Sequence, residues 1–276
     1  MTATLFIVAT PIGNLGDITL RALETLRAVD TIACEDTRHA RRLIDHHGIG
    51  TPLIALHEHN EAQAAQRLIA LLEEGKSVAL ISDAGTPAIS DPGARAVAAV
   101  RIAGFRVTPI PGPNAAIAAL SASGFEGPFH FVGFLPPKVG ARRTALEALK
   151  ALPATLVFYE APHRIEETVA DLVGVLEPER EIVIARELTK LFEQIERMPL
   201  PAAPDWLAAD ENHRRGEFVL VVSAPPPHLG LDAESERILK LLLAELPVKQ
   251  AARVAAEITG QPKNALYARA IEMKGG

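Results

Sequence analysis

Short apolar runs alternate with helical patterns along the first half of the chain. The runs are four or five residues long and bounded by Gly, Pro, Asn or Asp, so they predict buried strands. Asp17 and Asp36 are candidate N-caps of two helices, and a third helix, residues 60–74, ends before Gly75. The strands are expected at residues 5–9, 31–34, 53–56, 78–81 and 106–110. This alternation is typical of an α/β domain with a mostly parallel sheet, which we place at residues 1–123.

Residues 124–138 interrupt this pattern with four of the nine phenylalanines and three prolines. We interpret them as a linker that enters a second domain, residues 124–224, through one strand. Strands are expected at residues 129–134, 155–159, 181–185 and 217–223, and helices at 141–150 and 163–176. Because the strands need not be parallel, the pattern predicts a smaller α/β or α+β domain.

The run Pro225-Pro226-Pro227 predicts a stiff spacer, after which residues 225–276 form a third, helical segment. Helical periodicity covers residues 234–246, 248–258 and 264–273. Two short helices joined by a turn that contains Gly are typical of a helix-turn-helix. From Pro247 onward the chain has five Lys or Arg residues and two Glu residues. On charge alone, a solvated helical cap explains this segment as well as nucleic-acid binding does.

Loops rich in Gly and Pro follow three of the predicted strands, at residues 10–17, 82–93 and 109–116. In open α/β sheets, ligands bind beyond the carboxyl ends of the strands, so the three loops together predict a ligand cleft. The chain has neither a phosphate-binding P-loop motif nor a dinucleotide-binding glycine fingerprint after its first strand. The ligand is therefore expected to be of another kind.

Composition narrows the function classes. The 276 residues are 48% hydrophobic and 22% charged, as in ordinary globular proteins. The net charge of −6 gives no overall attraction to nucleic acid, so an RNA partner would need a local basic surface. No apolar run is long enough to span a membrane and no basic segment precedes the first run, so we expect a cytoplasmic protein. Cys34 is the only cysteine, which excludes an internal disulfide and a multi-thiolate metal site.

Seven motifs resemble, in their order and residues, those of the tetrapyrrole methylase superfamily of S-adenosylmethionine-dependent methyltransferases. They are most similar to the motifs of its members that act on small-subunit ribosomal RNA. They lie at residues 9–17, 35–38, 57–61, 82–93, 111–114, 158–164 and 186–190. The resemblance implies a two-domain α/β fold with the cofactor in the cleft, followed by a small helical segment. It also implies a homodimer that methylates the 2′-oxygen of a cytidine ribose in the decoding region of 16S ribosomal RNA, within the small ribosomal subunit.

The same resemblance implies which residues hold S-adenosylmethionine. They are Pro11, Asp83, Gly85, Thr86, Pro87, Ile89, Asn114, Ala115, Tyr159 and Glu160. Relatives that act on tetrapyrroles have an acidic residue at the position of Thr86, so this chain departs from their pattern there.

Two polar clusters after predicted strands are candidates for catalysis, because a ribose hydroxyl is a weak acid and needs a base or a stabilising cation. In the first, Asp36 and Arg38 are either catalytic or an N-cap with its ion pair. In the second, Lys190 with a lowered pKa would accept the proton and Glu187 would orient it, the alternative being a surface ion pair. The cluster at residues 57–61 contains two histidines, but nothing nearby completes a metal site, and we expect no metal.

The expected RNA contacts are basic and spread over all three segments: Arg41, Arg42, Arg142, Arg143, Arg164, Lys249, Arg253, Lys263 and Arg269. Aromatic residues make up only 4% of the chain, which favours recognition of RNA shape and backbone over stacking. Two alternatives stay open. One is a tetrapyrrole methyltransferase of the same fold, and the other is a non-catalytic helix-turn-helix regulator that uses the cleft as a sensor.

Overall fold

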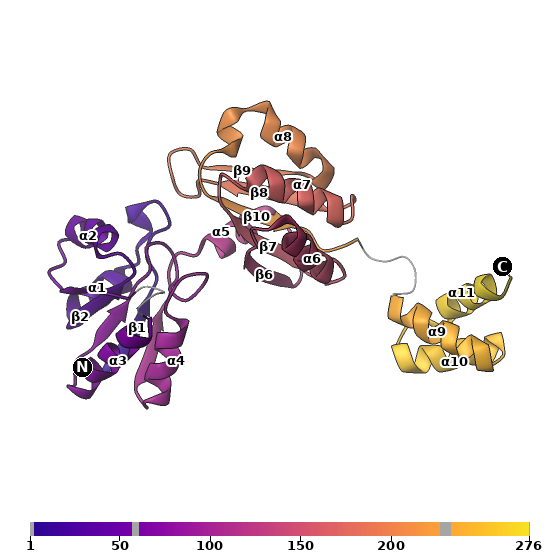
Figure 1. Cartoon of the computed structure of the whole chain (residues 1–276), viewed down its shortest axis with the longest axis horizontal. Helices are drawn as coiled ribbons and strands as arrows, with labels where there is room; N and C mark the ends of the chain where they lie inside the picture. Colours follow the sequence, from indigo (N-terminus) through magenta and orange to yellow (C-terminus); the bar gives the residue numbers. More distant parts are fainter. Residues whose placement is uncertain (1–2, 57–60, 227–232, 276) are drawn as a thin grey trace. The chain divides into compact units, whose positions relative to one another are not determined.

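Two five-stranded sheets form the framework of residues 1–225, which cluster as one unit, and residues 226–276 form a second unit (Figure 1). The computed structural model describes residues 3–56, 61–226 and 233–275. Each unit is described by itself below.

The first sheet is wholly parallel, with strand order β3-β2-β4-β1-β5. Helices lie on both of its faces (Figure 1). Phe6 and Val8 pack with α1 and α2, whereas Leu5 and Ile7 pack with α3 and α4, as the two-residue period of a strand requires. The strands are β1 (Thr4–Val8), β2 (Thr31–Cys34), β3 (Leu53–Ala55), β4 (Val78–Leu80) and β5 (Arg106–Ile110), and the helices are α1 (Leu20–Ala28), α2 (Thr37–His46), α3 (Glu61–Glu73) and α4 (Ala94–Ile102).

Two of the helix starts test the predicted caps. Asp36 caps α2 by accepting a hydrogen bond from Arg38 N, as expected. Asp17 does not cap α1, because it lies in a short 3-10 helix (Leu15–Asp17), and Thr19 accepts the capping bond from Ala22 N instead. A hydroxyl can satisfy the unpaired amides of a helix start as a carboxylate does, so Thr19 serves as the cap in place of Asp17.

The second sheet is mixed, with order β6-β7-β10-β8-β9 and only the β6–β7 pair parallel. One face is covered by α6, α7 and α8 and the other by α5 (Ala115–Ser123). Helix α5 directly follows β5 but packs on the second sheet. The chain therefore leaves the first sheet at the end of β5, before α5 begins. The remaining elements are β6 (Phe129–Phe134), α6 (Val139–Lys150), β7 (Thr155–Glu160), α7 (Ile165–Val175), β8 (Glu181–Arg186), β9 (Gln194–Pro199), α8 (Ala203–Ala209) and β10 (Phe218–Val222).

The described residues of the C-terminal unit, 226 and 233–275, form three helices, α9 (Ala233–Glu245), α10 (Val248–Thr259) and α11 (Lys263–Gly275). Small and aliphatic side chains, including Leu239, Ala252 and Leu266, form its own buried core. The left-handed Gly260 ends α10 and turns the chain into α11, which is the predicted helix-turn-helix connection. Among the described residues, no helix is both long and apolar enough to cross a membrane.

Candidate functional site

A cavity of about 340 Å³ lies beyond the carboxyl end of β4, between loops of the first sheet and strands β7 and β10 of the second. This volume falls in the range of small-molecule sites. The wall combines apolar and polar groups. It is formed by Ile12, residues 84–86, 89–91, 114–115, Phe134, residues 159–162, Leu188, Lys190 and residues 217–219.

Hydrogen bonds tie the three predicted Gly/Pro loops to one another. Thr10 and Gly85 exchange two backbone hydrogen bonds, of 2.8 and 3.0 Å, and Thr86 Oγ1 donates to the carbonyl of Pro113 at 3.0 Å. Ala88 and Ser90 have φ values of 68° and 62°, in the left-handed region that residues with side chains rarely adopt. Such strained backbone persists where the surroundings hold it, and it occurs often at ligand sites.

The N-terminus of α5 forms another part of the cavity wall. Asn114 caps the helix by accepting from Ile117 N at 3.1 Å, and Ala116 N donates to the hydroxyl of Tyr159 at 3.2 Å. Burial raises the pKa of Tyr159, which therefore stays protonated. Because a helix N-terminus carries a partial positive charge, this wall suits an anionic group such as a carboxylate.

Lys190 lies at the cavity between two carboxylates. Its Nζ donates to Glu187 Oε1 at 2.9 Å and to Glu217 Oε2 at 2.8 Å. Burial acts to lower the pKa of Lys190, but the bonds to Glu217 and Glu187 outweigh it, so the pKa is raised. The prediction of a lowered pKa is wrong, and Lys190 is an ammonium at neutral pH rather than a proton acceptor.

The segment that carries Lys190 is strained and closely packed. Glu187 and Thr189 have φ values of 51° and 65°. A Cβ atom on Gly13 would lie 2.5 Å from Lys190 Cγ, so glycine is needed where the loop after β1 meets this segment. The close approach joins the first-sheet loops to the second sheet at the cavity.

The Asp36–Arg38 pair adopts the capping arrangement. Arg38 Nη2 donates to Asp36 Oδ2 at 2.8 Å, and Arg38 N donates to Asp36 Oδ1 at 2.8 Å. These hydrogen bonds from Arg38 lower the pKa of Asp36 to about 2. Neither residue is among the described residues that line the cavity, and the Arg38 side chain is 90% exposed. Asp36 N donates to Asp83 Oδ1 at 3.2 Å, which connects this cap to the loop after β4.

Most of the predicted cofactor residues line the cavity: Gly85, Thr86, Ile89, Asn114, Ala115, Tyr159 and Glu160. Pro11, Asp83 and Pro87 are not among its described lining residues, and Ile12 takes the place expected for Pro11. The carboxylate of Glu160 is buried and accepts from Thr168 Oγ1 at 2.6 Å and from Ala161 N at 2.8 Å. The Glu160 carboxylate is therefore buried and already hydrogen-bonded within the protein.

Sequence reasoning missed Phe134 and Glu217 as cavity residues, and it placed Asp91 at the cleft only as part of the loop 82–93, without a role of its own. Asp91 closes the same Gly/Pro loop that predicted the cleft, so its place in the motif was an available signal. Glu217 stands at the start of a strand, far in sequence from Lys190, and no local pattern indicated that the two side chains meet.

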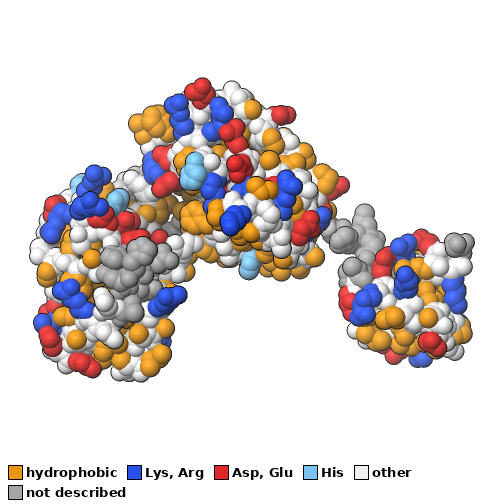
Figure 2. All heavy atoms as spheres, viewed as in Figure 1, with side chains coloured by type: hydrophobic (Ala, Val, Ile, Leu, Met, Phe, Trp, Pro, Cys, Tyr) orange, Lys and Arg blue, Asp and Glu red, His pale blue; other side chains and the backbone are white. Residues whose placement is uncertain are grey.

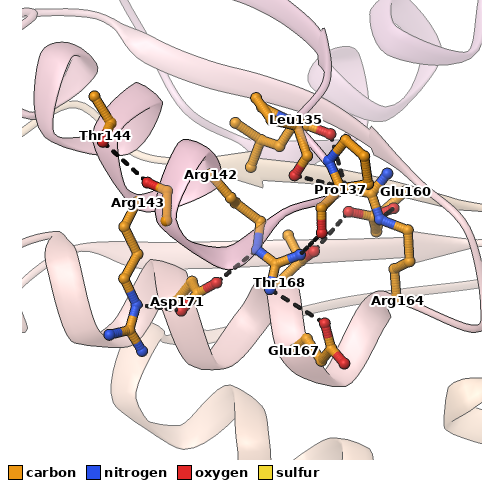
Figure 3. Close-up of polar contacts among 12 residues, drawn as sticks. Leu135, Pro137, Arg142, Arg143, Thr144, Glu160, Arg164, Glu167, Thr168 and Asp171 are labelled. Atoms are coloured by element: carbon orange, nitrogen blue, oxygen red, sulfur yellow. Dashed lines mark hydrogen bonds and ion pairs between the residues drawn. The ribbon is translucent and has the colours of Figure 1, made fainter.

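Arg142 requires a correction. Its side chain is 1% exposed, and its Nε donates to Asp171 Oδ2 at 2.5 Å (Figure 3). Arg143 bonds the other oxygen of Asp171 at 2.7 Å and is 61% exposed. Arg164 is also largely occupied, since its Nη2 donates to the carbonyl of Leu135 at 2.7 Å. We therefore withdraw Arg142 as an RNA contact, because a buried guanidinium cannot reach a phosphate.

The other basic candidates are scattered over the surface. Arg41 and Arg42 are exposed on α2, and Figure 2 shows Lys and Arg interspersed with Asp and Glu on the face in view. In the C-terminal unit, Arg253 and Arg269 form ion pairs with glutamates. Lys249 and Lys263 are exposed, and no ion pair to another described residue is observed for them.

Metal and thiol chemistry have no support in the part of the chain that is described. It contains no group of three or more His, Cys, Asp or Glu side chains that could hold a metal ion. His57 and His59 lie outside the described residues. Burial raises the pKa of Cys34 to about 12, so its thiol is inert.

Comparisons with known proteins agree with this architecture. The family model described as Tetrapyrrole (Corrin/Porphyrin) Methylases matches residues 4–204, and that of the RsmI C-terminal HTH domain matches residues 230–274. The solved structure of the methyltransferase CobJ has a TM-score of 0.61 at 19% identity, covering 81% of this chain and 95% of that one. The fold is therefore that of a tetrapyrrole methylase with an added helical domain, as predicted.

Full-length relatives narrow the class further. Ribosomal RNA small subunit methyltransferase I of Pseudomonas aeruginosa is 54% identical over 276 residues, covering 99% of this chain and 98% of the relative. The protein of that name from Escherichia coli O157:H7 is 54% identical over 273 residues, covering 98% and 96%. The chain belongs to the ribosomal RNA small subunit methyltransferase I family within the tetrapyrrole methylases, which confirms the family predicted from its motifs.

Proposed function

We propose that this protein transfers a methyl group from S-adenosylmethionine to the 2′-oxygen of a cytidine ribose in the decoding region of 16S ribosomal RNA. The observation that carries the proposal is the similarity to the ribosomal RNA methyltransferase of Pseudomonas aeruginosa, which spans 99% of this chain. It includes the C-terminal helical domain, which lies outside the part matched by the tetrapyrrole methylase family model.

The cavity suits the chemistry of this cofactor, which combines a sulfonium and an ammonium with a carboxylate and an apolar adenine. Asp91 supplies negative charge, the N-terminus of α5 supplies partial positive charge, and Ile12, Phe134 and Tyr159 supply apolar surface. Bound there, the cofactor supplies an electrophilic methyl group. The protein's task is to place the ribose oxygen behind that methyl group and to exclude water.

Lys190 is the residue we assign to the developing negative charge on the ribose oxygen. An ammonium held in place by two carboxylates is preorganised, so it stabilises charge without having to reorient during the reaction. Glu187 positions Lys190 in this scheme. Asp36 and Arg38 position the loop after β2, and through Asp83 the loop after β4, where the RNA approaches the cavity.

We assign the remaining basic candidates to phosphate contacts. These are Arg41, Arg42, Arg143, Arg164, Lys249, Arg253, Lys263 and Arg269. Phosphate contacts position a protein on RNA without reading its sequence, so they are compatible with cations dispersed over the surface. We further propose that the protein acts in the cytoplasm as a homodimer, on RNA within the small ribosomal subunit.

The test is incubation of the purified protein with labelled S-adenosylmethionine and, in separate reactions, small ribosomal subunits lacking the modification, free 16S RNA and tetrapyrrole precursors. We expect label on the subunits or the free RNA and none on tetrapyrroles. Label on tetrapyrroles alone would identify a small-molecule methylase. Tight RNA binding with no label on any substrate would identify a regulator.

A further inference from the structure

We propose that Asp91 is the countercharge of the cationic methyl donor and makes the pocket prefer the donor over the spent cofactor. The inference rests on the proposed function only for the identity of the cofactor. It concerns a residue whose role neither the motifs nor the family matches assign.

Asp91 occupies a fixed position in the cavity wall. Its loop is held at one end by the Thr10–Gly85 hydrogen bonds and further along by the bond from Thr86 to Pro113. On the other side, Ser90 packs against the β-bulge of β6, because a Cβ atom on Gly133 would lie 3.0 Å from Ser90 Oγ. The left-handed residues Ala88 and Ser90 have little freedom to move while these interactions hold the loop. Asp91 is therefore presented to the ligand by a preformed wall.

Among the described residues, the charged groups that act on the Asp91 carboxylate are both negative. Glu35 follows β2 and Asp83 follows β4, and both repel a negative charge on Asp91. Tyr159 faces it from β7 and stays neutral. Lys190 lines the same cavity but is already held by Glu187 and Glu217.

The electrostatic consequence is an unsatisfied site for positive charge. Burial raises the pKa of Asp91 to about 6, the charges of Glu35 and Asp83 act in the same direction, and a hydrogen bond with Ser82 only partly opposes them. A cation in the cavity would favour the ionised carboxylate and lower this pKa. The cavity therefore holds a carboxyl group whose charge depends on the charge of the ligand.

Methyl transfer changes the charge of the ligand. The ribose 2′-oxygen forms a bond to the methyl carbon while the bond from sulfur to that carbon breaks, and its electron pair stays on sulfur. The proton of the hydroxyl leaves to bulk water, and the positive sulfonium becomes a neutral thioether. The carboxylate of Asp91 then has one favourable partner fewer, while Glu35 and Asp83 continue to repel it. The pocket is expected to hold S-adenosylhomocysteine more weakly than the donor, which favours product release.

Calorimetric titration of the full-length protein with S-adenosylmethionine and with S-adenosylhomocysteine tests this directly. For the wild type at pH 7.5 we expect tighter binding of the donor. Asp91→Asn should weaken donor binding on the order of tenfold and product binding less than about twofold, because only the donor carries the sulfonium charge that the carboxylate attracts. Asp91→Glu keeps the charge and should retain the preference, and Asp45→Asn, on the exposed face of α2, is the matched control.

Protonation supplies a second measurement. Donor binding near pH 6, measured in buffers of different ionisation enthalpy, should release protons from the wild type and fewer from Asp91→Asn, because the cation lowers the pKa of Asp91. Equal weakening of donor and product would place Asp91 at the ammonium that both ligands share and overturn the proposed discrimination. Unchanged binding of both would remove Asp91 from recognition. Failure of the wild type to bind either ligand would instead overturn the proposed function.

Discussion

The ammonium of Lys190 donates to Glu217 Oε2 at 2.8 Å, across 27 residues of sequence, and to Glu187 Oε1 at 2.9 Å. Glu187 Oε1 also accepts from Glu217 N at 3.0 Å, so the three residues form one closed network at the cavity. The network keeps Lys190 charged and fixed, and that is the basis of the role we assign to it.

Lys190→Met should therefore reduce turnover far more than it reduces cofactor affinity. We expect kcat to fall by about a hundredfold, the usual loss when one preorganised charge-stabilising donor is removed. Single-turnover methylation and calorimetric binding of S-adenosylmethionine measure the two effects. Lys76→Met is the control, because Lys76 forms a surface ion pair with Glu74 and is expected to tolerate the change. Turnover equal to that of the wild type would exclude Lys190 from the mechanism.

Gly13→Ala tests the close packing of the loop after β1 on the Lys190 segment. The added Cβ would lie 2.5 Å from Lys190 Cγ and 2.9 Å from Thr189 Oγ1, so the segment must shift. We expect methylation to fall on the order of tenfold, because a displaced Lys190 no longer lies where it stabilises the developing charge. Gly50→Ala is matched, because a Cβ there meets nothing within 4 Å. If both variants were as active as the wild type, this packing would have no part in shaping the site.

Asp171→Asn tests the buried ion pair between Arg142 and Asp171, which is the reason that Arg142 is not among the proposed RNA contacts. Breaking such a pair leaves a buried cation poorly compensated and should lower the free energy of unfolding by about 3–5 kcal/mol. Burial acts to raise the pKa of Asp171, but the bonds from Arg143 and Arg142 outweigh it and the pKa is lowered. Its stabilisation is thus fully present above its unfolded pKa of about 3.9 and is lost as the pH falls through the lowered value.

Denaturant unfolding of the wild type and Asp171→Asn at pH 7 and at pH 3 measures this dependence. The difference between the two proteins should be large at pH 7 and smaller at pH 3. Asp45→Asn, at an exposed position, should show little difference at either pH. A difference that stayed the same at both pH values would mean that the ionised carboxylate is not its source.

Lys249 and Lys263 test whether the C-terminal unit contacts RNA. Replacing both by Ala should weaken RNA binding and reduce the salt dependence of the affinity, by about 0.7 in the log-log slope for each phosphate that is no longer neutralised. Cofactor affinity should not change. Lys240→Ala, at an exposed position on α9, is the control. An unchanged salt slope in the double variant would favour the alternative that this unit is a solvated cap.

Local patterns predicted most of the strands and α-helices but not β9, α4 or α8. β9 (Gln194–Pro199) is an edge strand with mixed polar and apolar residues and a final proline, so it lacks the apolar run that identified the buried strands. α4 and α8 carry few large apolar residues, and α8 has only seven residues. Their helical state depends on packing against the sheets, which the local sequence does not encode.

The cavity wall was more predictable than the polar network. Gly85, Thr86 and Asn114 belong to contiguous loops whose Gly and Pro content marks them. Lys190 was recognised in a motif, but its protonation state depends on Glu217, which the β10–β8 pairing brings to its side. A pKa that depends on contacts between distant strands cannot be inferred from spacing along the chain.

The most direct test of the account is nucleoside mass spectrometry of 16S ribosomal RNA after reaction of unmodified small subunits with the purified protein and S-adenosylmethionine. The proposed function predicts one added methyl group on the ribose of a cytidine, recovered as 2′-O-methylcytidine from a fragment of the decoding region. A methyl group on a base, or a methylated ribose only outside that region, would contradict it.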